Sequence, residues 1–272
     1  MNIVLHCMIS LVILYSLMLT PCYGLNRKLF NVSQIQSNNN KWQMAIATWY
    51  GPPEGAGSDG GACGYVDTVE KPPLNKMISA GGPSLFKGGQ GCGACYEVKC
   101  NKNSACSGKA MRVMITDNCP GCESTQFDLS GTAFGSIAKR GQAQNLRNAG
   151  KINIQYRRYF LIRLYLVKCY FGKSIAFTID SGSNPYYFAT EIEYENGDGD
   201  IVDVEVNQSN TWLPMQRSWG AKWALNKGSQ FQAPFSIKIT QRGNGGDKTI
   251  VAKNVIPRNW KPGQVYRSTV NF

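Results

Sequence analysis

The chain has 272 residues, of which 43% are hydrophobic, and its 29 lysine and arginine residues outnumber 17 acidic ones, so that its formal net charge is +12. The apolar content excludes general disorder, and the length is sufficient for two domains with cores of their own. A basic chain is attracted to polyanions, but its cations are scattered and no recognition motif accompanies them, so we expect no nucleic-acid partner.

Residues 1–24 are predicted to be a secretory signal peptide. The apolar run from Ile9 to Leu19 is too short to span a bilayer comfortably, and small residues precede a cleavage site near Leu25. We therefore expect secretion without stable membrane insertion. The alternative, a buried core helix, fits poorly with the N-terminal position and with the polar, asparagine-rich sequence of residues 25–43, which is predicted to be a flexible lead.

The single histidine, His6, lies within this signal peptide. Its position bears on the sequence GCGACY at Cys92 and Cys95, which fits the pattern around the nucleophile of papain-type proteases. That chemistry needs a histidine base, and removal of the signal peptide leaves none. Cys-His, Ser-His-Asp and histidine-containing zinc sites are therefore excluded together.

Ten cysteines are present, and eight remain once Cys7 and Cys22 are removed with the signal peptide. An even number in a secreted chain indicates disulfides, although eight cysteines allow about 105 pairings. The alternative is a four-thiolate zinc site made of the pairs Cys92/Cys95 and Cys119/Cys122. Thiols in an oxidising compartment tend to be oxidised, so we predict no metal and no other cofactor.

From Met44 to about Arg158 the sequence has short apolar alternations such as RVMIT and KINIQYR, punctuated by glycine and proline. This pattern predicts an all-β barrel or sandwich with long loops. The most helix-like stretch has Ser130 as a suitable N-cap and Gly141 as a suitable stop.

Beyond about residue 173, alternating strands separated by turn clusters predict a small β-sandwich. The acidic segment NGDGD, which begins at Asn196, fits a hairpin turn better than a calcium loop, because Ile201 stands where an EF-hand requires glycine.

Several motifs in chain order resemble the plant expansins, and closely the β-expansin branch: ATWYG, GGACGY, AGGPSLFKGGQGCGACYEVKC, ITDNCPGC, FDLSGTAFGSIAK, GSNPYYFATEIEYENGDGDI and RSWGAKW. The resemblance covers nearly all of the mature chain. It implies a six-stranded double-psi β-barrel similar to endoglucanases over residues 44–158, a linker over 159–172, and an immunoglobulin-like β-sandwich that binds polysaccharide over 173–272. The implied activity is loosening of the plant cell wall without hydrolysis.

The first domain offers carboxyl groups for glycoside hydrolysis, which needs two of them. The resemblance implies that Asp128 stands where the related endoglucanases keep their acid, that the catalytic base is missing, and that Asp117 and Asp59 line the same groove. Composition alone would favour an Asx turn for Asp117 in ITDN.

Sugar rings pack their apolar faces on exposed aromatic rings, while their hydroxyls require hydrogen-bond partners. The resemblance implies an open strip of Trp49, Tyr187 and Trp219 across both domains, and it adds Thr48 and Tyr50 to the barrel part of the groove. For the remaining tryptophans of the second domain, core packing is the better prediction: Trp212, Trp223 and Trp260.

The family pattern also implies four disulfides: Cys63–Cys92, Cys95–Cys169, Cys100–Cys106 and Cys119–Cys122. Two features depart from it. Gln126 replaces a family histidine and cannot titrate, and the apolar segment YFLIRLYLVKCY at 159–170 is much longer than the usual connection and would shift Cys169 away from the barrel. The sequons at Asn31 and Asn207 are permitted glycosylation sites.

We therefore expect a secreted, monomeric protein of the plant cell wall whose partners are cellulose and matrix polysaccharides, including xylan and, because of its charge, acidic glycans. Two alternatives stay open. One is a glycoside hydrolase that acts through Asp128 and a second carboxylate, and the other is a carbohydrate-binding protein without loosening activity.

Overall fold

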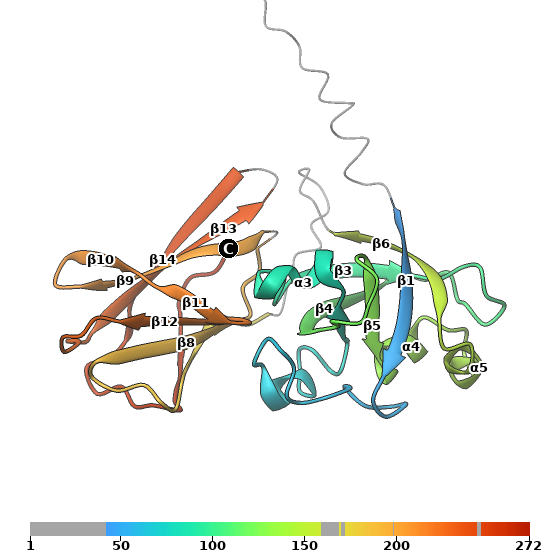
Figure 1. Ribbon diagram of the computed structural model, residues 1–272, viewed down its shortest axis with the longest axis horizontal. Helices are drawn as coiled ribbons and strands as arrows, with labels where there is room; N and C mark the ends of the chain where they lie inside the picture. The colour runs from blue at the N-terminus through green and yellow to red at the C-terminus, as the bar shows by residue number, and fades with distance from the viewer. Residues whose placement is uncertain (1–41, 159–168, 170–171, 198, 244–245) are drawn as a thin grey trace, which may run out of the picture. The chain divides into compact units, whose positions relative to one another are not determined.

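The computed structural model describes residues 42–158, 169, 172–197, 199–243 and 246–272, all within one compact unit, Asn40–Phe272 (Figure 1). The predicted signal peptide, the sequon at Asn31 and most of the apolar segment 159–170 lie outside these residues. In the part of the chain that the structure describes, no helix is long and apolar enough to cross a membrane.

The first half of the described chain forms a closed six-stranded barrel, with strand order β1-β5-β2-β4-β3-β6. Pairs β1–β5 and β2–β4 are parallel and the other neighbours are antiparallel. The all-β prediction with a six-stranded barrel is confirmed. The strands are β1 (Gln43–Tyr50), β2 (Ile78–Gly81), β3 (Cys95–Lys99), β4 (Met111–Asn118), β5 (Gln126–Ser130) and β6 (Ile152–Arg158).

The interior of the barrel follows from the alternation that the sequence shows along each strand. Ala45 and Ala47 on β1 are buried, as are Phe127 and Leu129 on β5, and small side chains facing large ones let the strands close around a packed core. Short helical segments cover the connections: η1 (Val66–Val69), α3 (Pro83–Phe86), η2 (Lys87–Gly89), α4 (Gly131–Ser136) and α5 (Ala143–Asn148).

The helix predicted after Ser130 begins as expected, since the Ser130 hydroxyl accepts a hydrogen bond from the backbone N–H of Ala133 (3.0 Å). It does not continue to Gly141. Helix α4 ends at Ser136, because the next residues hydrogen-bond to the loop that precedes β4: Ser107 N–H donates to the carbonyl of Ile137 (3.0 Å).

The second half of the chain forms a sandwich of two antiparallel sheets, of order β10-β9-β13-β14 and β11-β12-β8-β7-β15. Their buried faces share one apolar core. The strands are β7 (Ala176–Ile179), β8 (Tyr187–Glu193), β9 (Asp200–Gln208), β10 (Thr211–Pro214), β11 (Gln216–Trp219), β12 (Lys222–Asn226), β13 (Phe235–Gly243), β14 (Gly246–Ile256) and β15 (Val265–Arg267).

Two predictions for this half are wrong. The NGDGD segment is no hairpin turn, because β8 and β9 belong to different sheets and the segment between them crosses from one sheet to the other. Trp223 is buried and Trp260 packs against the core, but Trp212 is not part of it. Trp212 pairs with Asn207, so it lies on the outer face of its sheet, with the Lys238 ammonium 4.3 Å from its ring centroid.

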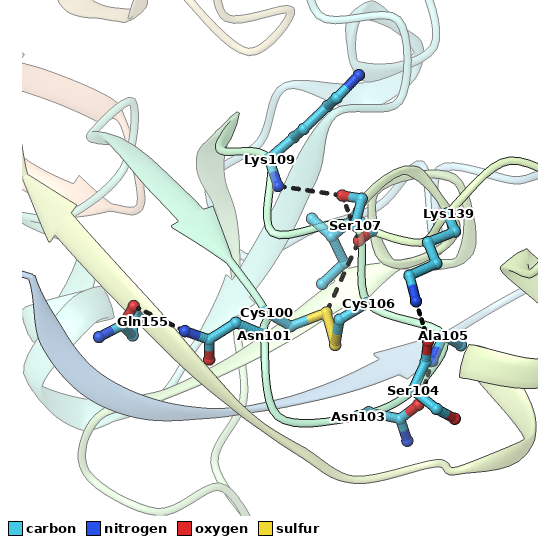
Figure 2. The surroundings of a disulfide bond; sticks show 11 residues. Cys100, Asn101, Asn103, Ser104, Ala105, Cys106, Ser107, Lys109, Lys139 and Gln155 are labelled. Atoms are coloured by element: carbon cyan, nitrogen blue, oxygen red, sulfur yellow. Dashed lines mark hydrogen bonds between the residues drawn. A yellow bond between two sulfur atoms is a disulfide. The ribbon is translucent and has the colours of Figure 1, made fainter.

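The eight cysteines outside the predicted signal peptide form the four pairs that the resemblance implied, with Cα–Cα distances of 5.3 to 5.7 Å: Cys63–Cys92, Cys95–Cys169, Cys100–Cys106 and Cys119–Cys122. Figure 2 shows the surroundings of the Cys100–Cys106 bond. No thiol is left for the alternative zinc site. Across the described ranges there is also no cluster of histidine, cysteine or carboxylate side chains able to hold a metal. Despite the long segment before it, Cys169 is buried and bonded to β3.

Candidate polysaccharide-binding site

The parallel pairing of β1 with β5 places Thr48 opposite Asp128. The Thr48 hydroxyl donates to Oδ1 of Asp128 (2.5 Å) and accepts from Nε2 of Gln126 (3.0 Å). Because Gln126 supplies the donor, the Thr48 proton is directed to the carboxylate. Gln126 is itself buried, and its Oε1 accepts from the backbone N–H of Glu123 (3.1 Å). The residue that replaces the family histidine is therefore a fixed part of this chain of hydrogen bonds.

Asp128 sits in an environment that favours its protonated form. Burial is the main cause that raises the pKa of its carboxyl group, and the charge of Asp117 adds to the rise, whereas the hydrogen bond from Thr48 opposes it. A carboxyl group with a raised pKa suits proton donation or hydrogen-bond donation at acidic pH. The resemblance places the acid of the related endoglucanases at this position, and that role stays a prediction.

Asp117, near the end of β4, holds a loop to the barrel. Its Oδ1 accepts from the backbone N–H groups of Ala62 (2.6 Å) and Asn118 (2.7 Å), and its Oδ2 accepts from the hydroxyl of Ser58 (3.5 Å). Asp59 lies on this loop and is exposed, with no hydrogen-bond partner for its side chain among the described residues. ITDN forms the end of strand β4, and the bond to Asn118 goes to the next residue, so no Asx turn is formed; the bond to Ala62 is a long-range contact.

Tyr50 completes this end of the barrel. Burial, and after it the charges of Asp117 and Asp128, raise the pKa of its phenol well above the usual range, so Tyr50 stays protonated. Its hydroxyl is buried and has no hydrogen-bond partner among the described residues. Gly57, at φ +95°, makes room for the ring, because a Cβ there would lie 2.3 Å from Cζ of Tyr50. We call Thr48, Tyr50, Asp117, Gln126 and Asp128 the barrel cluster.

Trp49 is less open than the resemblance implied. Its indole N–H donates to the backbone carbonyl of Arg147 (3.0 Å), and its ring packs against the barrel core, 6.5 Å from the ring of Phe134. Arg147 is buried and fixed in turn by Glu54 (2.7 Å). Trp49 is therefore an anchored, half-buried ring next to the barrel cluster.

Two aromatic residues of the sandwich, Tyr187 and Trp219, lie on the same face of one sheet. Tyr187, Ala189 and Glu191 alternate along β8 and point away from the core that holds Phe188. Glu191 pairs with Lys222, and Lys222 pairs with Trp219, so all of these side chains share one face. Strand spacings separate Tyr187 from Trp219 by about 17 Å. Ala189 and Ala224 pair between them, but Ala189 is fully buried and Ala224 is half-buried, so the rings and Lys222 make the accessible part of this face.

Trp219 is the most accessible tryptophan that the structure describes, with 45% of its surface exposed. The Lys222 ammonium lies 4.8 Å from its ring centroid and also pairs with Asp180 and, at 3.6 Å, with Glu191. The tip of the Trp219 ring lies close to the barrel, because a Cβ on Gly64 (φ +89°) would stand 3.1 Å from it. Trp219 thus lies where the sandwich face reaches the barrel. We call Tyr187, Trp219 and Lys222 the platform.

The sequence analysis missed three side chains of this region. Lys222 stands in the motif RSWGAKW but is brought to the Trp219 ring only by the β11–β12 pairing. Asp180 follows β7 and reaches Lys222 across the sheet. Tyr186, adjacent to the predicted Tyr187, is 54% exposed and has the larger open surface of the two. The SNPYY turn could have indicated that Tyr186 is exposed, whereas no sequence pattern pointed to Asp180.

Two buried glutamates lie beside the platform. Burial raises the pKa of Glu195 to about 8, and the charge of Glu193 adds to the rise while Arg217 opposes it. Burial likewise raises the pKa of Glu191 to about 7, against the opposing charge of Lys222. Both side chains face the barrel, since a Cβ on Gly93 would lie 2.3 Å from Oε1 of Glu195, and one on Gly64 would lie 2.8 Å from Oε1 of Glu191.

Comparisons with known proteins agree with this architecture. Residues 175–257 match the family described as the expansin C-terminal domain, and residues 78–156 match DPBB_1, described as a lytic transglycolase family. Putative expansin-B2 from Arabidopsis thaliana is 51% identical over 260 residues, which cover 93% of this chain and 91% of that protein. Expansin-B11 from Oryza sativa subsp. japonica is 50% identical over 239 residues, which cover 85% and 78%.

A solved structure supports the fold as well. The chain is similar, with a TM-score of 0.62 and 24% identity, to a mutant Clavibacter michiganensis expansin crystallised in complex with cellohexaose. The match covers 85% of this chain and 98% of that one. The apo form of the same bacterial protein matches with a TM-score of 0.61.

Proposed function

Because the chain belongs to the plant expansin-B family, we propose that it is a secreted wall-loosening protein that binds cellulose and matrix polysaccharides and separates them without hydrolysis. The observation that carries the proposal is the platform. An exposed tryptophan and a half-buried tyrosine share one sheet face. Such a face suits the apolar faces of sugar rings in an extended chain. The bacterial relative crystallised with cellohexaose supports a glucan as ligand.

In this proposal the barrel cluster supplies the hydrogen bonds. The Asp128 carboxyl group and the Thr48 hydroxyl are fixed by Gln126, so they need no reordering when they meet the hydroxyls of a sugar. Trp219 touches Gly64 of the barrel, so a chain lying on the platform is led toward this cluster. The contacts made to one polysaccharide chain compete with those that the chain makes to its neighbours, and that competition loosens the wall.

The hydrogen bonds of Asp117 favour the nonhydrolytic hypothesis over the hypothesis of a glycoside hydrolase. A second catalytic carboxylate must activate water or attack the sugar. Oδ1 of Asp117 already accepts two backbone hydrogen bonds, from Ala62 and Asn118, so this oxygen holds the chain in place and is not free to activate water or attack a sugar. Gln126 offers no base in its place.

The test is creep of heat-inactivated plant wall strips under constant load with the purified protein, while the bath is assayed for released reducing ends. We expect creep without released ends. Released ends would instead establish a glycoside hydrolase that acts through Asp128. Cellulose binding with neither creep nor released ends would leave a carbohydrate-binding protein without loosening activity.

A further inference from the structure

The sequon Asn207-Gln208-Ser209 lies at the tip of the hairpin formed by β9 and β10. The two strands pair as far as Gln208 with Thr211, so the turn consists of two residues, Ser209 and Asn210. Both have positive φ, +51° and +63°, as the type I′ turn of tight hairpins requires. Both are exposed. The acceptor sequence therefore stands at the solvent-facing end of a hairpin whose register is fixed.

The hairpin directs the Asn207 side chain to the outer face of its sheet. Val206 and Gln208 flank Asn207 on β9, are both buried, and point to the opposite side of the sheet. Asn207 is half-buried, and its side-chain amide makes no hydrogen bond within the part of the chain that the structure describes. A sugar attached to this amide replaces no bond of the fold.

A tryptophan ring lies next to this acceptor. Trp212 on β10 is directly opposite Asn207. In a two-residue hairpin the residues that flank the turn form a hydrogen-bonded pair, so the next pair, Asn207 and Trp212, is a non-hydrogen-bonded one. The Cα atoms of such a pair are about 4.5 Å apart and its side chains are the closest cross-strand neighbours. The Trp212 side chain is therefore adjacent to the amide that would carry the sugar.

Charged neighbours hold the ring on this face. Strands β10 and β13 lie on either side of β9, and the Lys238 ammonium from β13 stands 4.3 Å from the Trp212 ring centroid. Ring and lysine thus meet over β9, the strand that carries Asn207. Glu205, two residues before Asn207, pairs with the same ammonium (2.6 Å). The cation–π contact and the ion pair restrict the ring before any sugar arrives, so packing against it needs little further ordering.

We propose that Asn207 carries an N-linked glycan whose first N-acetylglucosamine packs on the Trp212 ring. The donor is a lipid-linked oligosaccharide diphosphate of the secretory pathway. Nδ2 of Asn207 forms a bond to C1 of the first sugar and loses one proton, while the bond from C1 to the diphosphate oxygen breaks and the lipid diphosphate leaves. The attached sugar then offers an apolar C–H face to the ring. This inference rests on the proposed function only for secretion.

A glycan at Asn207 leaves the platform open. The platform belongs to the sheet β11-β12-β8-β7-β15, whereas Asn207 belongs to the other sheet, and the outer faces of the two sheets of a sandwich point in opposite directions. The glycan covers the Trp212 ring, which is the tryptophan on the outer face of that other sheet. Binding of a wall glucan is thereby directed to Trp219.

The first test is the occupancy of Asn207 in the full chain, expressed in plant cells with its own N-terminal region. Exported protein is digested, and the peptide that contains Asn207 is analysed by mass spectrometry before and after enzymatic removal of glycans. We expect a glycan on this peptide in the wild type and none on it in Asn207→Gln or Ser209→Ala. Exported protein with an unmodified Asn207 would overturn the proposal, whatever the state of the separate sequon at Asn31.

Packing on the ring is tested by thermal melts of four exported proteins: wild type, S209A, W212A and S209A/W212A. The change at Ser209 removes the glycan but keeps Asn207, and the W212A background measures the effect of that same change without the ring. We expect S209A to lower the melting temperature by about 2–4 °C when Trp212 is present and by less than ~1 °C when it is absent. Equal shifts in the two backgrounds would overturn the proposed contact between sugar and ring.

Export, cellulose retention and wall creep, measured on the same samples, separate this inference from the proposed function. Exported protein that carries the glycan but shows neither cellulose binding nor creep would refute the proposed function and leave the glycan standing. Protein that loosens walls with Asn207 unmodified would refute the glycan alone. A chain kept inside the cell without a glycan would refute both, because the donor is met only on the secretory route.

Discussion

Replacement of Trp219 by alanine tests the platform most directly. About 45% of the residue is exposed, which for a side chain of ~250 Å² is about 110 Å². A sugar chain covers one face of the ring, so roughly half of that area leaves water on binding. At ~25 cal/mol per Å² this contributes about 1.4 kcal/mol, or tenfold in affinity.

Trp212→Ala is the matched control, because Trp212 and Trp219 have similar surroundings. Each lies on an outer sheet face of the sandwich with a lysine ammonium over its ring, at 4.8 Å for Trp219 and 4.3 Å for Trp212. The two faces belong to different sheets. Trp219→Ala should therefore weaken binding about tenfold, and Trp212→Ala should leave it unchanged.

The assay is a depletion isotherm on microcrystalline cellulose at matched protein concentrations, with melting temperatures recorded for both variants. Equal affinities of Trp219→Ala and the wild type, with an unchanged melting temperature, would refute the assignment of the platform as the glucan-binding face. An equal loss in both variants would show that the sandwich binds through general hydrophobicity instead.

Three further outcomes follow from the packing and the electrostatics. The pKa of Glu195 is raised from 4.5 to about 8 in the fold. Its contribution to stability is therefore complete below pH ~4.5 and is lost as the pH rises toward 8. Melting temperatures should fall over that window, and should fall less in Glu195→Gln; parallel pH profiles of the two proteins would contradict the assignment. Gly57→Ala should lower the melting temperature by about 4–10 °C, because the new Cβ strikes Tyr50 and the backbone has φ +95°, while Gly60→Ala, which has nothing within 4 Å, should change it little. Thr48→Val removes the hydrogen bond that lowers the pKa of Asp128, so carboxyl NMR titration should show a higher pKa, and an unchanged value would mean that this bond does not stabilise the carboxylate.

The sequence carried enough information for the family, the fold class and the barrel strands. Period-two alternation around Phe127 and Ala47 is a local property, and it predicts a strand with one buried face wherever that strand finally pairs. The sequence has one histidine, His6, within the predicted signal peptide, and this count argues against histidine-dependent catalytic sites without any knowledge of geometry.

The details of the candidate site depended on long-range pairing. The side chains of Tyr187 and Trp219 share a face only through the register of three strands, and Trp212 lies outside the core because it stands opposite Asn207. A shift of one residue in either register would reverse the face on which these rings lie. No local pattern distinguishes the two cases.

The sequence alone determined properties that neighbouring residues or composition carry: most strands, the predicted export signal and the net charge. What only the tertiary structure decided is which distant groups meet. Strands β8 and β9 on either side of NGDGD belong to different sheets, Glu195 is buried, and Lys139 is hydrogen-bonded to Ala105 in the loop between β3 and β4. The physical reason is that burial and contact are set by the packing of whole elements, which removes water from some side chains and leaves others exposed.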